Sequence, residues 1–235
     1  MSSSTSIRQQ LEQRGLRPNK KLGQNFLLDE GYLRKIAKLA EQAPELAILE
    51  VGTGLGALTL ELASSGQIVK TIEIDRGLFS LLEEDLVHCP NVELVLGDVL
   101  QMDVGGLFPE QNYQVIANIP YYLTSKLIRQ LTESAHPPKL IHLLVQKEVA
   151  LRACEDAPDM NLLSLSIRLF GQAAKLFEIP AGAFYPAPKV DSAILRIEPY
   201  GESSFSKTKA DEVMRFARAA FQQKRKTLLN SLSSL

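Results

Sequence analysis

Short apolar runs alternate with amphipathic segments along most of the chain, which is the pattern of βα units. Five apolar runs, each bounded by polar, glycine or proline residues, predict strands at Leu46–Val51, Ile68–Ile74, Val92–Leu96, Tyr113–Asn118 and Leu140–Val145. Apolar residues at helical spacing predict helices over 29–43, 56–64, 77–86, 123–133 and 147–154. Asp29 is a candidate N-cap for the first of these helices. We therefore expect an α/β fold, in which a parallel sheet carries helices on both faces.

The last third of the chain is expected to close this sheet and to begin a second unit. Together with residues 161–171, two apolar runs over 174–179 and 190–197, joined by a proline-rich loop, are expected to close the domain with an antiparallel addition. Beyond 201 the composition becomes polar, and a helical pattern comes next over 210–221. We therefore predict a main domain over residues 1–200 and the start of a small helical domain over 201–235, too short to bury a core of its own.

Composition excludes several classes of protein. The 235 residues are 45% hydrophobic and 23% charged, as in ordinary globular proteins. The two cysteines, Cys89 and Cys154, stand in no spacing typical of a metal site, which favours a reducing compartment. The polar start leads into no apolar run, so we predict neither a secretory signal nor a membrane span. We expect a cytoplasmic protein without a metal or a membrane partner.

The net charge of −1 conceals an uneven distribution. Residues 1–21 have a charge of +4 and residues 205–235 a charge of +5, so the body between them is strongly acidic. The basic residues of interest are Arg14, Arg17, Lys20, Lys21, Lys224, Arg225 and Lys226. Basic patches on an acidic body are compatible with nucleic-acid binding. Taken alone, however, terminal charges more often belong to solvated tails.

A glycine-rich loop after the first predicted strand indicates a nucleotide-like ligand. Glu50 near the end of that strand is followed by Gly52, Gly54 and Gly56, and then by a helical pattern. Glycines allow a tight turn and a close approach of the backbone to a ligand. The loop fits both a dinucleotide-binding fingerprint and the loop of S-adenosylmethionine enzymes. Glu73, at the end of the next strand, can accept both hydroxyls of a ribose, which either cofactor contains.

Two further strand ends carry polar residues. Asp98 follows the third strand, where its carboxylate can accept from the amine of an adenine or can simply cap a turn. The fourth strand ends in Asn118-Ile119-Pro120-Tyr121. Methylation of a nucleobase amine needs acceptors for its hydrogens, which the Asn118 side chain and the Ile119 carbonyl offer. Pro120 stiffens this turn, and Tyr121 offers a face for stacking. Asn and Pro also end ordinary strands, but this combination favours a methyltransferase.

In the order and spacing of these motifs, the chain resembles the small-subunit rRNA adenine-N6,N6-dimethyltransferase family. The resemblance extends from about Leu16 to Leu232. The matching stretches are Leu22–Leu27, Glu50–Gly56, Glu73, Gly97–Asp98, Asn118–Tyr121, Gln146–Glu148 and Ala183–Ser192. The resemblance implies a Rossmann-like class I methyltransferase fold with S-adenosyl-L-methionine as cofactor. It also implies a partner, the 16S rRNA of the small ribosomal subunit. We expect the protein to act as a monomer.

The resemblance also assigns site residues by position. The residues expected to bind S-adenosylmethionine are Gln24, Asn25, Leu27, Glu50, Gly52, Gly54, Glu73, Asp98 and Asn118. The target adenine is expected at Asn118, Pro120 and Tyr121, with Phe184 closing on the base from the other side. Without the resemblance, Phe184 would be assigned to the core. Members of the family methylate two adjacent adenines near the 3′ end of the RNA, and the basic ends become the expected contacts with the RNA backbone.

The expected reaction is a direct in-line displacement, in which the adenine N6 attacks the sulfonium methyl and the extra proton leaves afterwards. Positioning and charge matching carry the catalysis, and no strong base is needed. The chain stops at Leu235, where family members usually continue through further helices, so rRNA docking is expected to suffer more than cofactor binding.

Three alternatives stay open on the sequence alone. The nearest is a large-subunit rRNA methyltransferase of the antibiotic-resistance type, although the Phe184–Ser192 stretch favours the small-subunit family. A second is a non-catalytic ribosome-assembly or transcription factor on the same fold, against which the intact motif residues speak. The third is an NAD-dependent oxidoreductase, for which we find no hydride-handling site.

Overall fold

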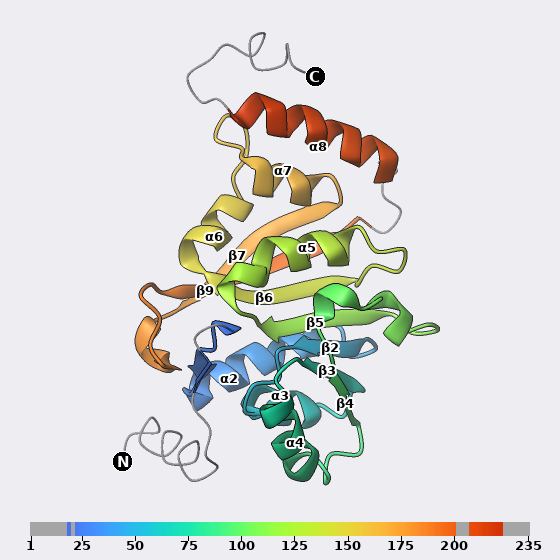
Figure 1. Cartoon of the computed structure of the whole chain (residues 1–235), viewed down its shortest axis with the longest axis vertical. Coiled ribbons are helices and arrows are strands. Elements are labelled where there is room, and N and C mark those ends of the chain that lie inside the picture. The colour runs from blue at the N-terminus through green and yellow to red at the C-terminus, as the bar shows by residue number, and fades with distance from the viewer. Residues whose placement is uncertain (1–17, 20–21, 201–206, 223–235) are drawn as a thin grey trace.

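A seven-stranded sheet with the strand order β4-β3-β2-β5-β6-β9-β7 runs through the molecule (Figure 1). The computed structural model describes residues 18–19, 22–200 and 207–222. The strands of this sheet are β2 (Ala47–Val51), β3 (Val69–Glu73), β4 (Val92–Leu96), β5 (Tyr113–Asn118), β6 (Leu140–Gln146), β7 (Gly171–Ile179) and β9 (Ser192–Pro199). From β4 to β6 neighbouring strands pair in parallel, whereas β9 pairs antiparallel with β6 and β7. The predicted parallel sheet and its antiparallel addition are therefore confirmed.

Helices cover both faces of the sheet, as the sequence predicts. They are α2 (Glu30–Ala37), α3 (Ala57–Ala63), α4 (Arg76–Asp85), α5 (Thr124–Thr132), α6 (Lys147–Ala153), α7 (Leu162–Arg168) and α8 (Lys207–Gln222). Short 3₁₀ helices lie at η2 (Lys38–Gln42), η3 (Val99–Gln101), η4 (Gly105–Leu107), η5 (Tyr121–Leu123) and η6 (Ala181–Ala183). Helices α2 and α3 share one buried cluster with Ile48 and Ile116. Helices α5, α6 and α7 share another with Val115 and Leu143, from strand positions of the opposite face.

The first helix is shorter than its sequence pattern predicts. Asp29 caps it as expected, because its Oδ1 accepts from the Tyr32 amide at 3.1 Å. The α-helix ends at Ala37 and tightens into η2, and the chain leaves the helical region at Ala43. Ala43 precedes Pro44, and the residue before a proline is disfavoured in helical geometry. The predicted helix over 29–43 is thus an α-helix followed by a 3₁₀ turn.

A separate two-stranded sheet has no counterpart in the predicted elements. Strand β1 (Phe26–Leu27) pairs antiparallel with β8 (Phe184–Tyr185), and the Leu28 amide donates to the Ala183 carbonyl at 2.9 Å. This pairing joins a segment near the start of the chain to one near its end. It places residues 22–28 beside the carboxyl ends of β2 and β5, where they line a large cavity.

Helix α8 lies against α7 at the end of the molecule farthest from α4 (Figure 1). Ala210 and Met214 are buried with Leu169 and Phe170 in one cluster. Asp211 Oδ1 accepts from Arg129 Nη2 of α5 at 2.9 Å. The helix therefore packs on the main domain, and the predicted boundary at residue 200 stays a prediction. Among the helices in the described ranges, none is long and apolar enough to cross a membrane.

Candidate active site

One large cavity opens at the carboxyl ends of the parallel strands. It encloses about 1180 Å³ when its open mouth is counted. Its lining residues fall within 22–28, 50–58, 72–74, 97–99 and 118–123, with Leu33 of α2. These segments follow β2, β3, β4 and β5, together with the segment that contains β1. The cavity thus lies where ligands bind in open α/β sheets, around the point at which the strand order reverses between β2 and β5.

The glycine loop between β2 and α3 has the backbone geometry that only glycine adopts readily. Gly52 and Gly54 have φ angles of +79° and +60°, in the left-handed region. A Cβ on Gly54 would lie 3.3 Å from the ring of Phe26, which packs over the loop from β1. A side chain at either position would strain the backbone and narrow the cavity. The loop therefore brings bare backbone to the cavity wall, as the sequence predicts.

Glu73 is the most highly coordinated carboxylate of the cavity. Its Oε2 accepts from the Gly54 amide at 2.9 Å, and its Oε1 accepts from the amides of Ile74 at 2.9 Å and Asp75 at 2.8 Å. Burial raises the pKa of Glu73, while these amide bonds oppose the rise. A carboxylate has about four acceptor positions, so three amides leave one on Oε2. The predicted contact of Glu73 with both hydroxyls of a ribose stays a prediction.

Glu50 is buried beneath the loop and faces two threonines. Its Oε2 accepts from Thr59 Oγ1 at 2.6 Å and from Thr71 Oγ1 at 2.8 Å. Burial raises the pKa of Glu50 to about 8, against which the two threonine hydroxyls act. The side chain is 1% exposed and lines the cavity, and its hydrogen bonds tie β2, α3 and β3 together. The sequence indicates Glu50 itself but not its partners, because a lone threonine in a strand or helix carries no such signal.

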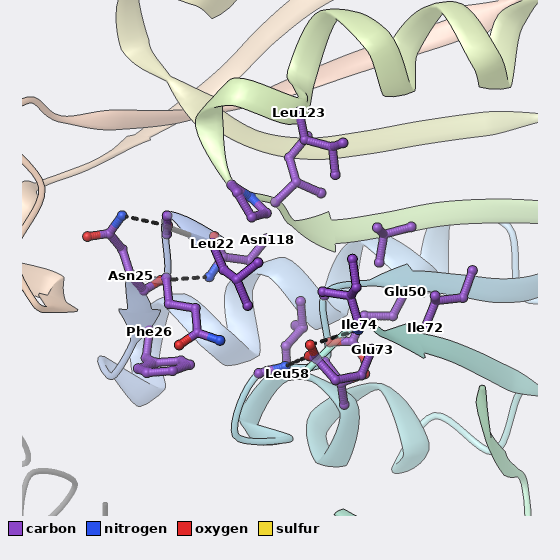
Figure 2. Close-up of a pocket in the computed structure, with 18 of the residues that line it drawn as sticks. Leu22, Asn25, Phe26, Glu50, Leu58, Ile72, Glu73, Ile74, Asn118 and Leu123 are labelled. Atoms are coloured by element: carbon purple, nitrogen blue, oxygen red, sulfur yellow. Dashed lines mark hydrogen bonds between the residues drawn. The ribbon is translucent and has the colours of Figure 1, made fainter. Parts of the chain in front are cut away.

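The segment around β1 forms the wall opposite Glu73 (Figure 2). Gln24 Nε2 approaches Asp75 Oδ2 at 3.4 Å, and Gln24 Oε1 accepts from the Asn19 amide at 2.7 Å. Asn25 Nδ2 donates to the Gly23 carbonyl at 3.1 Å. Gln24, Asn25 and Leu27 all line the cavity, so the structure brings these predicted cofactor residues to the same place as the glycine loop.

Asn118 ends β5 and points into the cavity between these two walls (Figure 2). Its Nδ2 donates to the Asn25 carbonyl at 3.4 Å. That bond uses the amide nitrogen and not the carbonyl oxygen, the atom predicted to accept from an adenine amine. Pro120 then starts the 3₁₀ turn η5, where the Leu123 amide donates to the Pro120 carbonyl at 2.9 Å. Asn118, Ile119, Pro120 and Tyr121 all line the cavity.

A comparison with known proteins agrees with this geometry. The model of the ribosomal RNA adenine dimethylase family matches residues 15–235. The chain belongs to this family. A ribosomal RNA small subunit methyltransferase A from Moorella thermoacetica is 40% identical over 236 residues, which cover 96% of this chain and 82% of the relative. A relative of the same name from Dehalococcoides mccartyi is 37% identical, over 99% of this chain and 80% of its own.

Solved structures place the fold in the same group of enzymes. A dimethyladenosine transferase from Plasmodium falciparum has a TM-score of 0.73 and 31% identity, covering 86% of this chain and 73% of its own. The 23S rRNA methyltransferase ErmE has a TM-score of 0.72 and 28% identity, covering 88% of this chain and 83% of its own. The predicted family, the class I methyltransferase fold, the enzyme class and the S-adenosylmethionine cofactor are thereby confirmed.

The residues present fit the cofactor of the rRNA adenine dimethylase family. The loop at Gly52 and Gly54 exposes backbone, and Glu73 retains an acceptor for a hydroxyl group. Asp98 lines the cavity and caps η3, because its Oδ1 accepts from the Leu100 amide at 2.9 Å. Both predicted roles of Asp98, cap and acceptor for an adenine amine, are thus compatible, since the carboxylate has further acceptor positions.

Phe184, which the family resemblance assigns to the target base, is buried in the described structure. Its side chain is 4% exposed and belongs to the buried cluster that contains Leu27 and Ile179. It does not contribute to the cavity lining. In the pairing of β8 with β1, Phe184 lies directly opposite Leu27, which is also buried in this cluster. In the described geometry the general expectation for a lone phenylalanine holds, and a stacking role for Phe184 stays a prediction.

The predicted RNA contacts are not part of the described structure. Arg14, Arg17, Lys20, Lys21, Lys224, Arg225 and Lys226 all lie outside residues 18–19, 22–200 and 207–222. Their role as contacts with the RNA backbone stays a prediction. Among the described residues, no group of three or more His, Cys, Asp or Glu side chains is arranged to hold a metal ion.

Proposed function

We propose that this member of the rRNA adenine dimethylase family dimethylates the N6 atoms of two adjacent adenines near the 3′ end of 16S rRNA. One observation carries the proposal: the turn Asn118–Tyr121 opens into the same cavity as Glu73 and the glycine loop. A site for a nucleobase amine therefore adjoins a site for a methyl donor. The relatives named for the small subunit, at 37–40% identity over nearly the whole chain, support the choice of RNA.

In the proposed mechanism, each side of the cavity has one task. S-adenosylmethionine, when bound, supplies a methyl group on a positively charged sulfur. The glycine loop and Glu73 would hold this cofactor by its nucleoside. The Asn118 carbonyl oxygen and the Ile119 backbone carbonyl accept the two amine hydrogens of the adenine and so orient its lone pair. The ring of Tyr121 stacks on the base and excludes water from one side of it.

The oligomeric state, the location and the domain division of the protein are part of the same hypothesis. The protein works as a monomer in the cytoplasm, where ribosomal subunits are assembled, and needs no metal. Residues 1–200 form the catalytic domain, and residues 201–235 begin a helical domain that packs on it through α8. The basic residues of the two ends contact the phosphates of the RNA.

The leading rival is a large-subunit methyltransferase, because ErmE shares the fold. Transfer of labelled methyl from S-adenosylmethionine to unmethylated small subunits tests the proposal, with large subunits in parallel and primer extension to map the sites. We expect label on two adjacent adenines near the small-subunit 3′ end. Label on the large subunit alone contradicts the proposal. Cofactor binding without any transfer favours a non-catalytic role in ribosome assembly.

A further inference from the structure

Hydrogen bonds hold Tyr121 both at its backbone and at the far end of its side chain. At the backbone, the Tyr121 carbonyl accepts from Thr124 Oγ1 at 3.0 Å, which fixes the start of η5. At the far end, the Tyr121 hydroxyl lies 2.8 Å from Ser192 Oγ, within hydrogen-bond distance. A ring held in this way has one remaining freedom, rotation about its own long axis. Its direction relative to the cavity is thereby set before any base enters.

Ser192 is well placed to serve as a fixed point. It is 0% exposed and is the first residue of β9, where it pairs with Gln146 of β6 on one side and Ile179 of β7 on the other. The residue before it is anchored as well. The Asp191 carbonyl accepts from the Lys147 amide at 3.0 Å, and Asp191 Oδ1 accepts from the Ala181 amide at 2.9 Å. The hydroxyl of Ser192 therefore belongs to a rigid junction of three strands.

We propose that Ser192 is a positioning residue, which fixes the ring of Tyr121 in the orientation that stacks on the target adenine. This inference rests on the proposed function for its substrate, but the contact itself does not depend on it. The hydroxyl of Tyr121 serves as a tether and takes no part in proton transfer. Burial raises the pKa of Tyr121 above its ordinary value near 10, so the phenol is protonated at neutral pH.

The hydrogen bond between Tyr121 and Ser192 contributes to catalysis because it orders the Tyr121 ring before the base binds. A free tyrosine side chain samples several rotamers, and each encounter with the RNA would have to select the one that stacks. Holding the ring in advance removes that cost from binding and from the transition state. A single neutral hydrogen bond contributes modestly, so loss of the tether should lower kcat/KM for small subunits about five- to tenfold.

A double-mutant cycle tests the proposal on the full chain. Ser192→Ala and Tyr121→Phe each remove one hydroxyl of the contact and leave the aromatic ring in place. We expect each single variant to lower kcat/KM about five- to tenfold and the double variant to be no worse than either. Multiplying effects would mean that the two hydroxyls act independently. If Tyr121→Phe kept the full kcat/KM while Ser192→Ala lowered it, the proposed role of the hydrogen bond would also be wrong.

Ser164→Ala is the matched control. Ser164 is another serine of 0% exposure, and it is bonded within the capping box of α7, away from the cavity. This variant loses stability through the same type of substitution, and we expect unchanged kcat/KM. A fall in kcat/KM equal to that of Ser192→Ala, at a similar loss of thermal stability, would reduce the role of Ser192 to folding.

A spectroscopic measurement keeps the inference testable if the substrate is misassigned. The chain has six tyrosines, so protein labelled with 3-fluorotyrosine gives few ¹⁹F resonances, and the signal missing in Tyr121→Phe belongs to Tyr121. We expect Ser192→Ala to move this signal toward that of Tyr122, which is 61% exposed, and Ser164→Ala to leave it in place. An unmoved Tyr121 signal overturns the tether, whereas absent methyl transfer by the wild type overturns only the proposed function.

Discussion

The two sides of the cavity are built in different ways. On the cofactor side, the carboxylates of Glu50 and Glu73 are buried near the ends of two neighbouring strands, β2 and β3. Their donors are hydroxyls from β3 and α3, and amides from the glycine loop and from the turn after β3. On the base side, Asn118 and Tyr121 carry neutral groups. Each is held by a partner far along the chain, 93 residues away at Asn25 and 71 residues away at Ser192.

This difference separates two properties of the enzyme. The hydrogen bonds of the Glu50 and Glu73 carboxylates are complete once β2, α3, β3 and the turn after β3 have formed, because their partners all lie within these segments. The base side is complete only when the segment with β1 and the strand β9 have both reached β5. Cofactor affinity and base positioning should therefore respond to different substitutions.

The largest effect is expected at Asn118, where the two sides meet. Asn118→Ala removes the acceptor for the adenine amine, and we expect methyl transfer to fall by about a thousandfold, as for other preorganised polar groups at a reacting centre. Transfer of labelled methyl to small subunits measures this loss. Asn91→Ala is the control, because Asn91 bonds the Ala63 and Gln67 carbonyls at the opposite edge of the sheet. Near-normal turnover of Asn118→Ala would remove Asn118 from the reacting centre.

The next largest effect, on stability, is expected at Glu50. Its pKa in the folded chain, about 8, lies above the ordinary value of 4.5, so the native state retains a proton that the unfolded chain releases. The stability contributed by this proton is therefore fully present below pH 4.5 and is lost as the pH rises toward 8. Glu50→Gln cannot release this proton. Denaturant titrations should show the variant gaining roughly 3 kcal/mol relative to wild type between pH 5 and pH 8. A constant difference would mean that Glu50 is charged in the fold.

The predictability of each region from sequence divides along the same line. The strands β2 to β6 and their helices are predictable because apolar residues recur at the spacing of a strand or a helix over five residues or more. The carboxyl ends of parallel strands meet at one edge of the sheet, which places Glu73, Asp98 and Asn118 together. The pair β1–β8 cannot be found in this way. Two-residue strands have no measurable period, and their pairing joins distant segments.

Partners of site residues are also beyond prediction from the chain alone. Thr59, Thr71 and Ser192 act through side-chain hydrogen bonds whose geometry exists only in the folded state. Phe184 shows the converse. The family resemblance assigns it to the base, the described structure pairs it with Leu27 and buries it, and a role at the base stays a prediction. A family resemblance identifies which position in the sequence corresponds to a functional residue. It does not show which side chains surround that position in the fold.

A smaller effect is expected at Glu73, on the cofactor side. Glu73→Ala removes the acceptor for a ribose hydroxyl and leaves three loop amides without their carboxylate, so we expect the Kd for S-adenosylmethionine to rise about thirtyfold. Isothermal titration calorimetry measures the change. Glu93→Ala on the neighbouring strand is the charge-matched control, because its exposed carboxylate pairs with Lys70 at 2.7 Å. An unchanged Kd in Glu73→Ala would show that the cofactor lies elsewhere in the cavity.

The smallest effect is expected at Tyr121, and it should fall on one side only. Tyr121→Ala removes the stacking face, and one base–aromatic contact is worth about 1–3 kcal/mol, so KM for small subunits should rise about tenfold. The Kd for S-adenosylmethionine should stay within about twofold, because the bonds of Glu73 and the glycine loop do not involve this ring. Tyr200→Ala, at an exposed tyrosine outside the cavity lining, controls for loss of an aromatic residue. If cofactor affinity falls as much as KM rises, the two sides of the cavity act as one unit, and the separation inferred from their hydrogen bonds is wrong.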